Sequence, residues 1–307
     1  MIGTHLPGRV RNVSLAPSNG LMPLFEAVSN SIHAIEEAGL APDEGRIKIE
    51  IKRTAPRFAF GDGETEIQGD IDGFTVTDNG VGFNEANFRS FRTLDSEHKV
   101  ARGGRGVGRL LWLKAFESVS VESIFKDDDG TYRRRSFTFG AASGVADATS
   151  DALDGRAQRR TVIALTGFRD RYRQQSYKTA VSIAAAIVEH GLWHFVRPGG
   201  TAKIVIEDGG DSLQLDDVYE QLMHASAVEQ RLTIKGEELH LLHVKLRAKA
   251  NAAHVVAYCA DDRVVTTEKL AGKIPGVHGR LSDQNGDFVY ACYVSSPTLN
   301  QSARPER

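Results

Sequence analysis

Residues 24–35 carry the clearest alternation of apolar and polar positions in the chain. At about 100° per residue, the large apolar side chains fall on one side of a helix. Glu26, Asn30 and His33 fall on the opposite side, at positions i, i+4 and i+7. The pattern therefore predicts a helix that packs one face against a core and holds a carboxylate, an amide and an imidazole on the other.

Shorter patterns after this helix predict several strands. Residues 46–53 alternate apolar and charged positions, which predicts a strand with one solvent-exposed face. Residues 73–77 predict a short strand that runs into a turn at Asp78, and Asn84 can cap a short helix. The glycines and charges of residues 55–70 predict a hairpin or a loop. Further elements are expected as a helix at 110–115 and strands at 118–125, 131–139 and 161–165.

The second half of the chain begins with a long helical pattern at residues 177–195 and a strand pattern at 203–207. Residues 208–210, Asp-Gly-Gly, then suggest a linker. Two domains are therefore expected, at 1–210 and 211–307. Because the chain stops just after a strand and a turn, the second domain is expected to be truncated at its C-terminus. Its predicted strands are 238–245, 254–259 and 287–294.

The composition is that of an ordinary globular protein, with 41% hydrophobic and 25% charged residues. A net charge of −2 argues against a surface built entirely for nucleic acid. Cys259 and Cys292 lie in apolar strand patterns and are expected to be buried thiols, without the spacing of a zinc site. No apolar run matches a signal peptide or the ~20 residues of a membrane span, so the cytoplasm is the expected location and no membrane contact is expected.

Two polar motifs along the chain suit the chemistry of a nucleotide. Glu26 can orient or deprotonate a water, and Asn30 offers a hard oxygen ligand of the kind that Mg²⁺ prefers. Asp78 ends a predicted strand, where its carboxylate can accept a hydrogen bond from an exocyclic amine. Gly80 and Gly82 lack a Cβ and let the backbone approach a flat ring.

A third motif, the glycine-rich residues 103–108, leads into a predicted helix, where backbone N–H groups can cradle phosphates. It does not follow a strand within a βαβ unit, which excludes a Rossmann site, and the chain has no P-loop sequence. Each motif alone is a weak signal. Their occurrence together, in this order and at this spacing, predicts a nucleotide site.

In this order the motifs resemble those of the GHKL ATPase superfamily, which includes gyrase B-type topoisomerases, heat-shock chaperone ATPases, histidine kinases and MutL. Residues 26–34 are similar to E-x-x-x-N-[SA]-x-[DH]-A, residues 78–82 to D-x-G-x-G, and residues 104–108 to G-x-G-x-G. A fourth similarity is the T-x-[IV]-x-L strand at residues 161–165. The set covers roughly residues 20–170.

The resemblance implies a role for each matched residue. It implies that Glu26 is the general base for the attacking water and that Asn30 is a ligand of Mg²⁺. It implies that Asp78 binds the adenine amino group of ATP, with Thr161 supporting it through a water. The glycines implied to line the adenine are Gly80 and Gly82.

Residues 84–109 are implied to form a lid over the nucleotide. Its glycine-rich end is implied to contact the phosphates, together with two basic side chains. The residues concerned are Lys99, Gly104, Arg105, Gly106, Val107 and Gly108. Residues 299–307 resemble a loop that carries a basic sensor of the γ-phosphate, for which Arg304 and Arg307 are candidates, although neither aligns without a shift.

The implied fold is α+β, a two-layer α/β sandwich of the GHKL ATPase type followed by a smaller α/β transducer-like domain. Its sheet is expected to be mixed and mainly antiparallel, with helices on one face. The implied function is Mg²⁺-dependent binding and hydrolysis of ATP, which drives lid closure and dimerisation or domain movement in a larger protein. The implied partners are a second copy of the chain, in a nucleotide-dependent homodimer, and DNA or a client protein contacted through other regions.

Two other functions stay open. A nucleotide-sensing module that does not hydrolyse its ligand would not require a base at Glu26. A histidine kinase catalytic domain requires an upstream helical hairpin with a phosphoacceptor histidine, and residues 1–23 hold His5 but no long helical pattern. His33, which is Asp in many members, is either a polar residue hydrogen-bonded beneath the site or a histidine that tunes Glu26 and makes activity depend on pH near neutrality.

Two arginine-rich runs stand outside the motifs. We interpret both as solvated strand or loop faces, with nucleic-acid binding as the alternative. They are Arg133, Arg134 and Arg135 in the first run and Arg169, Arg171 and Arg173 in the second. Trp112 and Trp193 lie in apolar helical patterns and are expected in the core.

Overall fold

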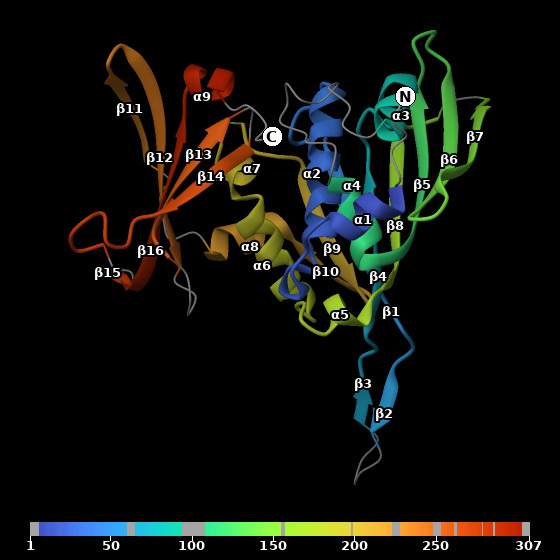
Figure 1. Cartoon of the computed structure of the whole chain (residues 1–307), viewed down its shortest axis with the longest axis horizontal. Helices are drawn as coiled ribbons and strands as arrows, with labels where there is room; N and C mark the ends of the chain where they lie inside the picture. The colour runs from blue at the N-terminus through green and yellow to red at the C-terminus, as the bar shows by residue number, and fades with distance from the viewer. Residues whose placement is uncertain are drawn as a thin grey trace. The chain divides into compact units, whose positions relative to one another are not determined.

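A computed structural model describes most of the chain (Figure 1). Within the described part, the chain divides into two compact units. The first comprises residues 6–93, 108–190 and 201–215, and the second comprises residues 191–200 and 216–302. The predicted boundary between residues 210 and 211 stays a prediction. The described residues are 6–59, 65–93, 108–154, 157–197, 199–222, 228–247, 253–260, 263–277, 279–284 and 286–302.

An eight-stranded sheet forms the framework of the first unit, in the order β10-β9-β1-β4-β8-β5-β6-β7. β1 and β9 are parallel, and every other neighbouring pair is antiparallel. The strands are β1 (Arg46–Arg53), β4 (Ile71–Asp78), β5 (Phe116–Lys126), β6 (Tyr132–Gly140), β7 (Gly144–Ala152), β8 (Arg160–Phe168), β9 (Lys203–Asp208) and β10 (Asp211–Gln214). The sheet is thus mixed and mainly antiparallel, as predicted.

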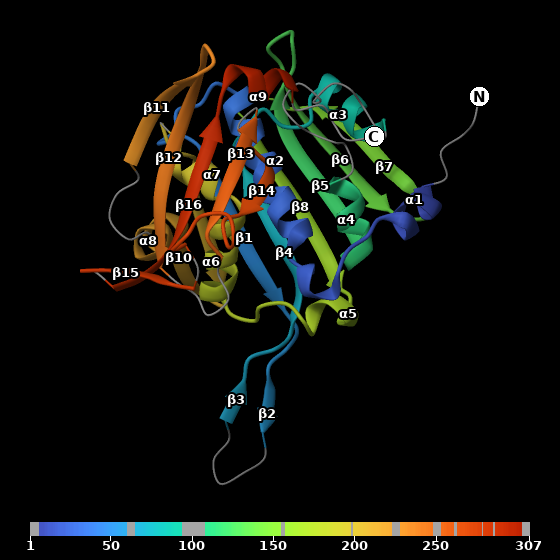
Figure 2. The same ribbon diagram turned by 60° about the vertical axis from the view of Figure 1, so that its left-hand side comes forward.

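Helices α2, α4 and α6 cover one face of this sheet (Figure 2), which confirms the predicted α+β sandwich. The apolar stripe predicted at residues 24–35 is buried against the strands, with Leu24 and Ala27 fully covered. The indole N–H of Trp112 on α4 donates to the backbone oxygen of Pro23 on α2 at 3.0 Å, which ties the two helices together. The helices are α1 (Leu6–Asn12), α2 (Met22–Glu37), α3 (Glu85–Arg92), α4 (Gly108–Ala115), α5 (Asp170–Arg173) and α6 (Ala180–His190), with a 3₁₀ turn at Pro17–Asn19.

A two-stranded hairpin, β2 (Arg57–Ala59) and β3 (Thr65–Ile67), extends from the ends of β1 and β4 (Figure 1). A buried ion pair lies at its base, where the Arg53 guanidinium donates to both carboxylate oxygens of Asp208, at 2.6 and 2.7 Å. The same guanidinium donates to the backbone oxygens of Gly69, at 3.0 Å, and Lys178, at 2.8 Å. One side chain therefore joins β1, β9, the end of the hairpin and the start of the α6 region.

The second unit contains a sheet in the order β11-β12-β16-β13-β14, with β15 paired to β16. Trp193 on α7 packs on Tyr293 on β16, with ring centroids 6.1 Å apart. Both predicted thiols, Cys259 and Cys292, are buried in this unit. Its elements are α7 (Leu192–Val196), α8 (Leu215–Leu222), β11 (Val228–Ile234), β12 (Glu237–Arg247), β13 (Val255–Ala260), β14 (Arg263–Lys269), β15 (Leu281–Asp283), β16 (Gly286–Ser295) and α9 (Pro297–Ser302).

Two predicted elements differ from the structure. The helix predicted at 177–195 is two helices, because the chain turns at Gly191, a residue that destabilises a helix interior. The linker predicted at 208–210 is instead the turn of the β9–β10 hairpin, where Gly209 and Gly210 have φ values of +61° and +103°. Among the described helices, none is both long enough and apolar enough to cross a membrane.

Candidate nucleotide site

The polar core of the site is the Asp78 carboxylate at the end of β4, which is 4% exposed. One carboxylate oxygen accepts a hydrogen bond from the Ser31 hydroxyl at 2.7 Å, and the other accepts from the Gly80 backbone N–H at 2.9 Å. Ser31 lies on α2 within the first motif, so the first and second motifs are in direct contact. Sequence reasoning did not single out Ser31, although it follows Asn30 directly.

Burial raises the pKa of Asp78 from its ordinary value of 3.8 to about 6, and the hydrogen bonds from Ser31 and Gly80 oppose this rise. The folded state therefore holds the proton more tightly than the unfolded state does. As the pH rises from about 4 to about 6, the ionisation of Asp78 lowers the free energy of unfolding. Above that range the lowering stays constant. A donor that reaches the ionised carboxylate would offset part of this lowering.

The loop after Asp78 packs closely on α2. The Val81 backbone N–H donates to the Ala34 oxygen at 2.9 Å. A Cβ at Gly80 would lie 2.6 Å from the Ala34 carbonyl carbon, so a side chain there would force the loop away from the helix. Gly82 has φ +76°, a conformation that favours glycine, and a Cβ there would lie 2.6 Å from the Ser123 hydroxyl. Both glycines thus have a packing requirement in addition to their predicted contact with a ligand.

Thr161 lies beside Asp78 because β4 and β8 pair these two residues directly. Its hydroxyl is hydrogen-bonded to that of Ser123 on β5 at 3.0 Å, and both side chains are buried. The Ser123 hydroxyl in turn accepts from the Phe83 backbone N–H at 2.9 Å. Two hydroxyls therefore connect β5, β8 and Phe83, the residue that follows the D-x-G-x-G loop. The sequence motifs indicate only the hydroxyl of Thr161.

The interpretation of the first arginine run as a solvated face is wrong for Arg135. Its side chain is buried and donates to the backbone oxygens of Phe83 and Asn84, at 2.8 and 3.1 Å. It also pairs with Glu85 at 3.0 Å and lies over the Phe88 ring at 4.3 Å. Arg135 thus fixes the chain between the D-x-G-x-G loop and α3, which begins after the predicted cap at Asn84.

Glu26 lies against the first residue of α4. A Cβ at Gly108 would come within 2.2 Å of one Glu26 carboxylate oxygen, so the absence of a side chain at Gly108 leaves the room that this carboxylate occupies. A helix N-terminus carries partial positive charge, which favours a carboxylate at this position. The first motif, at residues 26–34, therefore contacts Gly108, which is the described end of the glycine-rich third motif. On the same helix Asn30 is exposed and His33 is partly buried.

Several predicted site residues lie outside the described part of the chain. They are Lys99, Gly104, Arg105, Gly106, Val107, Arg304 and Arg307. Their roles stay predictions, as does the lid formed by residues 84–109. Among the described residues, the structure brings Asp78, Gly80, Gly82 and Thr161 together at the end of β4, and it brings Glu26 against Gly108. All of them lie in the first unit, together with Asn30 and His33 on α2.

An exposed amide one helical turn from Glu26 fits the way in which Mg²⁺ is commonly held, by one or two protein oxygens together with waters and phosphate oxygens. Asn30 supplies such an oxygen. In the described residues, no group of three or more His, Cys, Asp or Glu side chains is arranged to hold a metal ion.

Solved structures of ATPase domains are similar to this chain. The ATPase domain of Aquifex aeolicus MutL in complex with ADP is 14% identical with a TM-score of 0.47, over 96% of this chain and 99% of that one. The 43K ATPase domain of Thermus thermophilus gyrase B in complex with an aminocoumarin is 16% identical with a TM-score of 0.47, over 91% and 76%. The ATPase region of Saccharomyces cerevisiae topoisomerase II is 13% identical with a TM-score of 0.48, over 91% and 74%.

No protein-family model and no curated protein sequence matches the chain.

Proposed function

We propose that this chain binds ATP together with Mg²⁺ and hydrolyses it. The observation that carries the proposal is that one helix, α2, contains the first motif and contacts the second motif and the described end of the third. Ser31 donates to Asp78, Ala34 packs against Gly80, and the Glu26 carboxylate lies against Gly108. The Asp78 carboxylate on β4 and the start of α4 at Gly108 thus both lie against the helix that carries Glu26, which supports a single site for nucleotide binding and hydrolysis.

Adenine recognition would use the Asp78 carboxylate. Its position at the end of β4, beside the Thr161 hydroxyl, suits an acceptor for the exocyclic amino group. The hydrogen bonds from Ser31 and Gly80 hold the carboxylate in place before a ligand arrives. A preorganised buried acceptor favours an adenine over a base that presents a carbonyl oxygen at the same position, because two acceptors would then face each other.

Hydrolysis would use the Glu26 carboxylate to orient and deprotonate the water that attacks the γ-phosphorus atom. The contact between Glu26 and Gly108 supports this role, because Gly108 begins α4 at the end of the glycine-rich sequence that is proposed to bind the phosphates. Mg²⁺, bound with the nucleotide and ligated by Asn30, would offset negative charge on the phosphate oxygens. His33 would act by tuning Glu26.

Nucleotide binding would in turn close residues 84–109 over the site and favour a homodimer. Two sets of contacts among the described residues hold the ends of this segment. Arg135 fixes its start through Phe83 and Asn84. Arg109, at its end, is tied to its first part, since the guanidinium donates to the backbone oxygens of Ser90 and Thr93 at 3.1 and 2.7 Å.

Thermal unfolding with and without Mg²⁺-ATP tests the proposal on the wild type and on Asp78→Ala. A ligand at about a hundred times its Kd stabilises the folded state by roughly 2.7 kcal/mol, which raises the Tm by several degrees. We expect this rise in the wild type and its loss in Asp78→Ala. Asp72→Ala, on the same strand but away from the site, is the matched control and should keep the full rise. An equal rise in wild type and Asp78→Ala would overturn the assignment of Asp78.

The affinity for adenosine is expected to depend on pH through Asp78. Adenosine avoids the titration of phosphate groups, which itself occurs near pH 6. Because the pKa of Asp78 is about 6, its carboxylate is ionised above pH 7 and accepts the amino hydrogen bond well. As the pH falls through 6, the affinity should drop by up to about tenfold per pH unit. Isothermal titration calorimetry between pH 5 and pH 8 measures this profile.

The matched control is Asp78→Asn, which keeps an acceptor oxygen but does not titrate. Its affinity for adenosine should be weaker at pH 8 and constant over the same pH range. A wild-type affinity that stays constant between pH 5 and pH 8 would contradict a contact between the Asp78 carboxylate and the base.

A further inference from the structure

Strand β11 is the last strand on one side of the sheet in the second unit, as Figures 1 and 2 show. It pairs with β12 along one edge, and no described strand pairs with its other edge. Of its seven residues, six are exposed and only Leu232 is partly covered. Within the described part of the chain, the outer edge of β11 therefore offers backbone N–H and C=O groups to another extended strand.

The sequence of β11 is complementary to itself when two copies run antiparallel. With Gln230 opposite Gln230 of a second copy, Glu229 faces the other copy's Arg231, and Val228 faces the other copy's Leu232. The two-fold symmetry repeats each pair, so the contact contains two pairs of opposite charge and two apolar pairs. A strand with this pattern fits a second copy of the same chain.

The charges select one alignment of the two strands. Centring the pairing on Arg231 would place two guanidinium groups opposite each other, and centring it on Glu229 would do the same with two carboxylates. Like charges directly opposite each other destabilise a pair of strands. Gln230 is the one centre that sets each Glu229 opposite an Arg231, so the side chains specify the register as well as the direction.

The side chains that would meet the second copy are accessible in the single chain. Val228 is 54% exposed, which is unusual for a large apolar residue in a strand. The Arg231 side chain is 72% exposed, and its described ion pair is with Glu238 on β12 at 3.7 Å. Because both members of this pair are exposed, it contributes little, and Arg231 can turn toward a carboxylate of the second copy.

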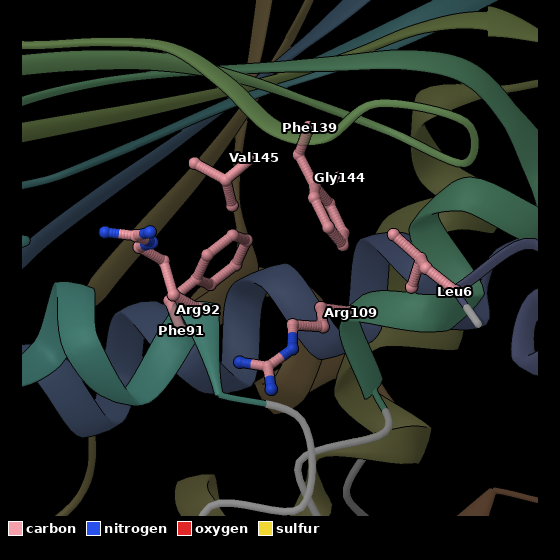
Figure 3. Close-up of a pocket in the computed structure, with 7 residues that line it drawn as sticks. All are labelled: Leu6, Phe91, Arg92, Arg109, Phe139, Gly144 and Val145. Atoms are coloured by element: carbon pink, nitrogen blue, oxygen red, sulfur yellow. The ribbon is translucent and has the colours of Figure 1, made fainter. Parts of the chain in front are cut away.

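The other edge strands of the two large sheets do not share this property. Strand β7, whose first residue Gly144 appears in Figure 3, carries Asp147 and Asp151 and no basic residue. On β14, the carboxylate of Glu268 already accepts a hydrogen bond from the Tyr258 hydroxyl at 3.1 Å. Strands β10 and β15 are only four and three residues long. Self-complementary pairing is therefore a property of β11 in particular.

We propose that β11 pairs antiparallel with β11 of a second copy of this chain, with Gln230 on the two-fold axis, so that the two sheets join. A contact of this kind is isologous and closes at two copies. It rests on few residues, so it belongs with the weak interfaces that bury less than about 1,200 Å². These residues lie in the second unit, outside the motifs of the nucleotide site, and the pairing requires no ATP.

Sedimentation equilibrium of the whole chain without nucleotide tests the proposal. We expect a reversible dimer with a Kd of roughly 10–100 µM. Glu229→Lys and Arg231→Glu each place two like-charged pairs across the contact and should weaken the dimer by about tenfold. The double variant exchanges the charges in both copies and should restore the dimer. Lys269→Glu, a charge reversal at an exposed position of β14, is the matched control and should dimerise like the wild type.

The charge exchange separates a specific pairing from damage to the fold, because a misfolded single variant would not be rescued by a second reversal. A double variant that dimerises no better than either single variant would overturn the proposal. A wild type that stays monomeric at about 1 mM would also overturn it, and would leave the edge of β11 to an extended segment of another protein.

Cross-linking of Gln230→Cys tests the register. In the proposed pairing the two Cα atoms at position 230 are about 4.5–5.5 Å apart, within the span of a disulfide. Mild oxidation should therefore give a covalent dimer on a non-reducing gel. In Thr233→Cys the two positions lie about 20 Å apart and should not cross-link, and the wild type, with its buried Cys259 and Cys292, gives the background. Equal cross-linking of the two variants, or none in Gln230→Cys, would overturn the proposal.

Discussion

Glu26→Gln is expected to lower the turnover of ATP by about 10²–10⁴-fold, because the amide cannot accept the proton of the attacking water. This range corresponds to about 2.7–5.5 kcal/mol of transition-state free energy. Binding of ATP should be nearly unchanged, since the amide has the same shape and still fits against Gly108. Steady-state phosphate release measures the turnover, and the Tm rise with Mg²⁺-ATP measures the binding in the same samples.

Glu36→Gln is the matched control, because it makes the same chemical change at an exposed position of the same helix. Its turnover should equal that of the wild type. Unchanged turnover in Glu26→Gln would remove Glu26 as the base. A wild type that binds Mg²⁺-ATP without releasing phosphate would instead favour the non-hydrolysing sensor over the ATPase.

Arg53→Ala is expected to reduce the free energy of unfolding by about 3–5 kcal/mol, because it leaves the Asp208 carboxylate buried without its cation. The Arg53 side chain is 13% exposed and that of Asp208 is 8% exposed, so water does little to compensate. The loss is a large share of the roughly 5–15 kcal/mol by which a typical domain is stable. Urea unfolding followed by circular dichroism measures it.

Lys52→Ala provides the comparison on the same strand. Lys52 pairs with Glu50 at 3.2 Å but is 55% exposed, and such a pair contributes about 0–1 kcal/mol. The double variant Arg53→Ala with Asp208→Ala should be more stable than Arg53→Ala alone, because it removes the uncompensated charge. A loss below about 1 kcal/mol in Arg53→Ala would mean that the ion pair is not a significant support of the sheet.

The elements whose residues alternate regularly between core and solvent could be predicted from the sequence. Residues 46–53 form β1 with the predicted bounds, and the polar face of α2 follows from helical spacing. In contrast, β7 (Gly144–Ala152) carries no apolar alternation, because most of this edge strand is exposed on both faces. It pairs with β6 through backbone hydrogen bonds, and these cannot be recognised from the pattern of apolar and polar side chains.

The candidate site could be predicted only as far as its motifs extend. Asp78 and Glu26 belong to recognisable sequence motifs, but the residues that hold the surrounding strands and loops in place do not. Ser123 contacts Thr161 across 38 residues, and Arg135 contacts Phe83 across 52 residues. Such contacts depend on strand register, and a serine in a strand or an arginine in a basic run looks like a surface residue until the register is known.

The parallel pairing of β1 with β9 has a consequence for synthesis of the chain. Ile47 on β1 lies beside Ile204 on β9. The residues of β1 are therefore synthesised long before those of β9, with which β1 pairs. At typical translation speeds of about 5–20 residues per second, the two strands leave the ribosome roughly 8–30 s apart. During this interval one edge of β1 has no neighbour, and that edge is open to mispairing with other nascent strands. We therefore expect β1 to be more prone to mispairing during translation than after the chain is complete.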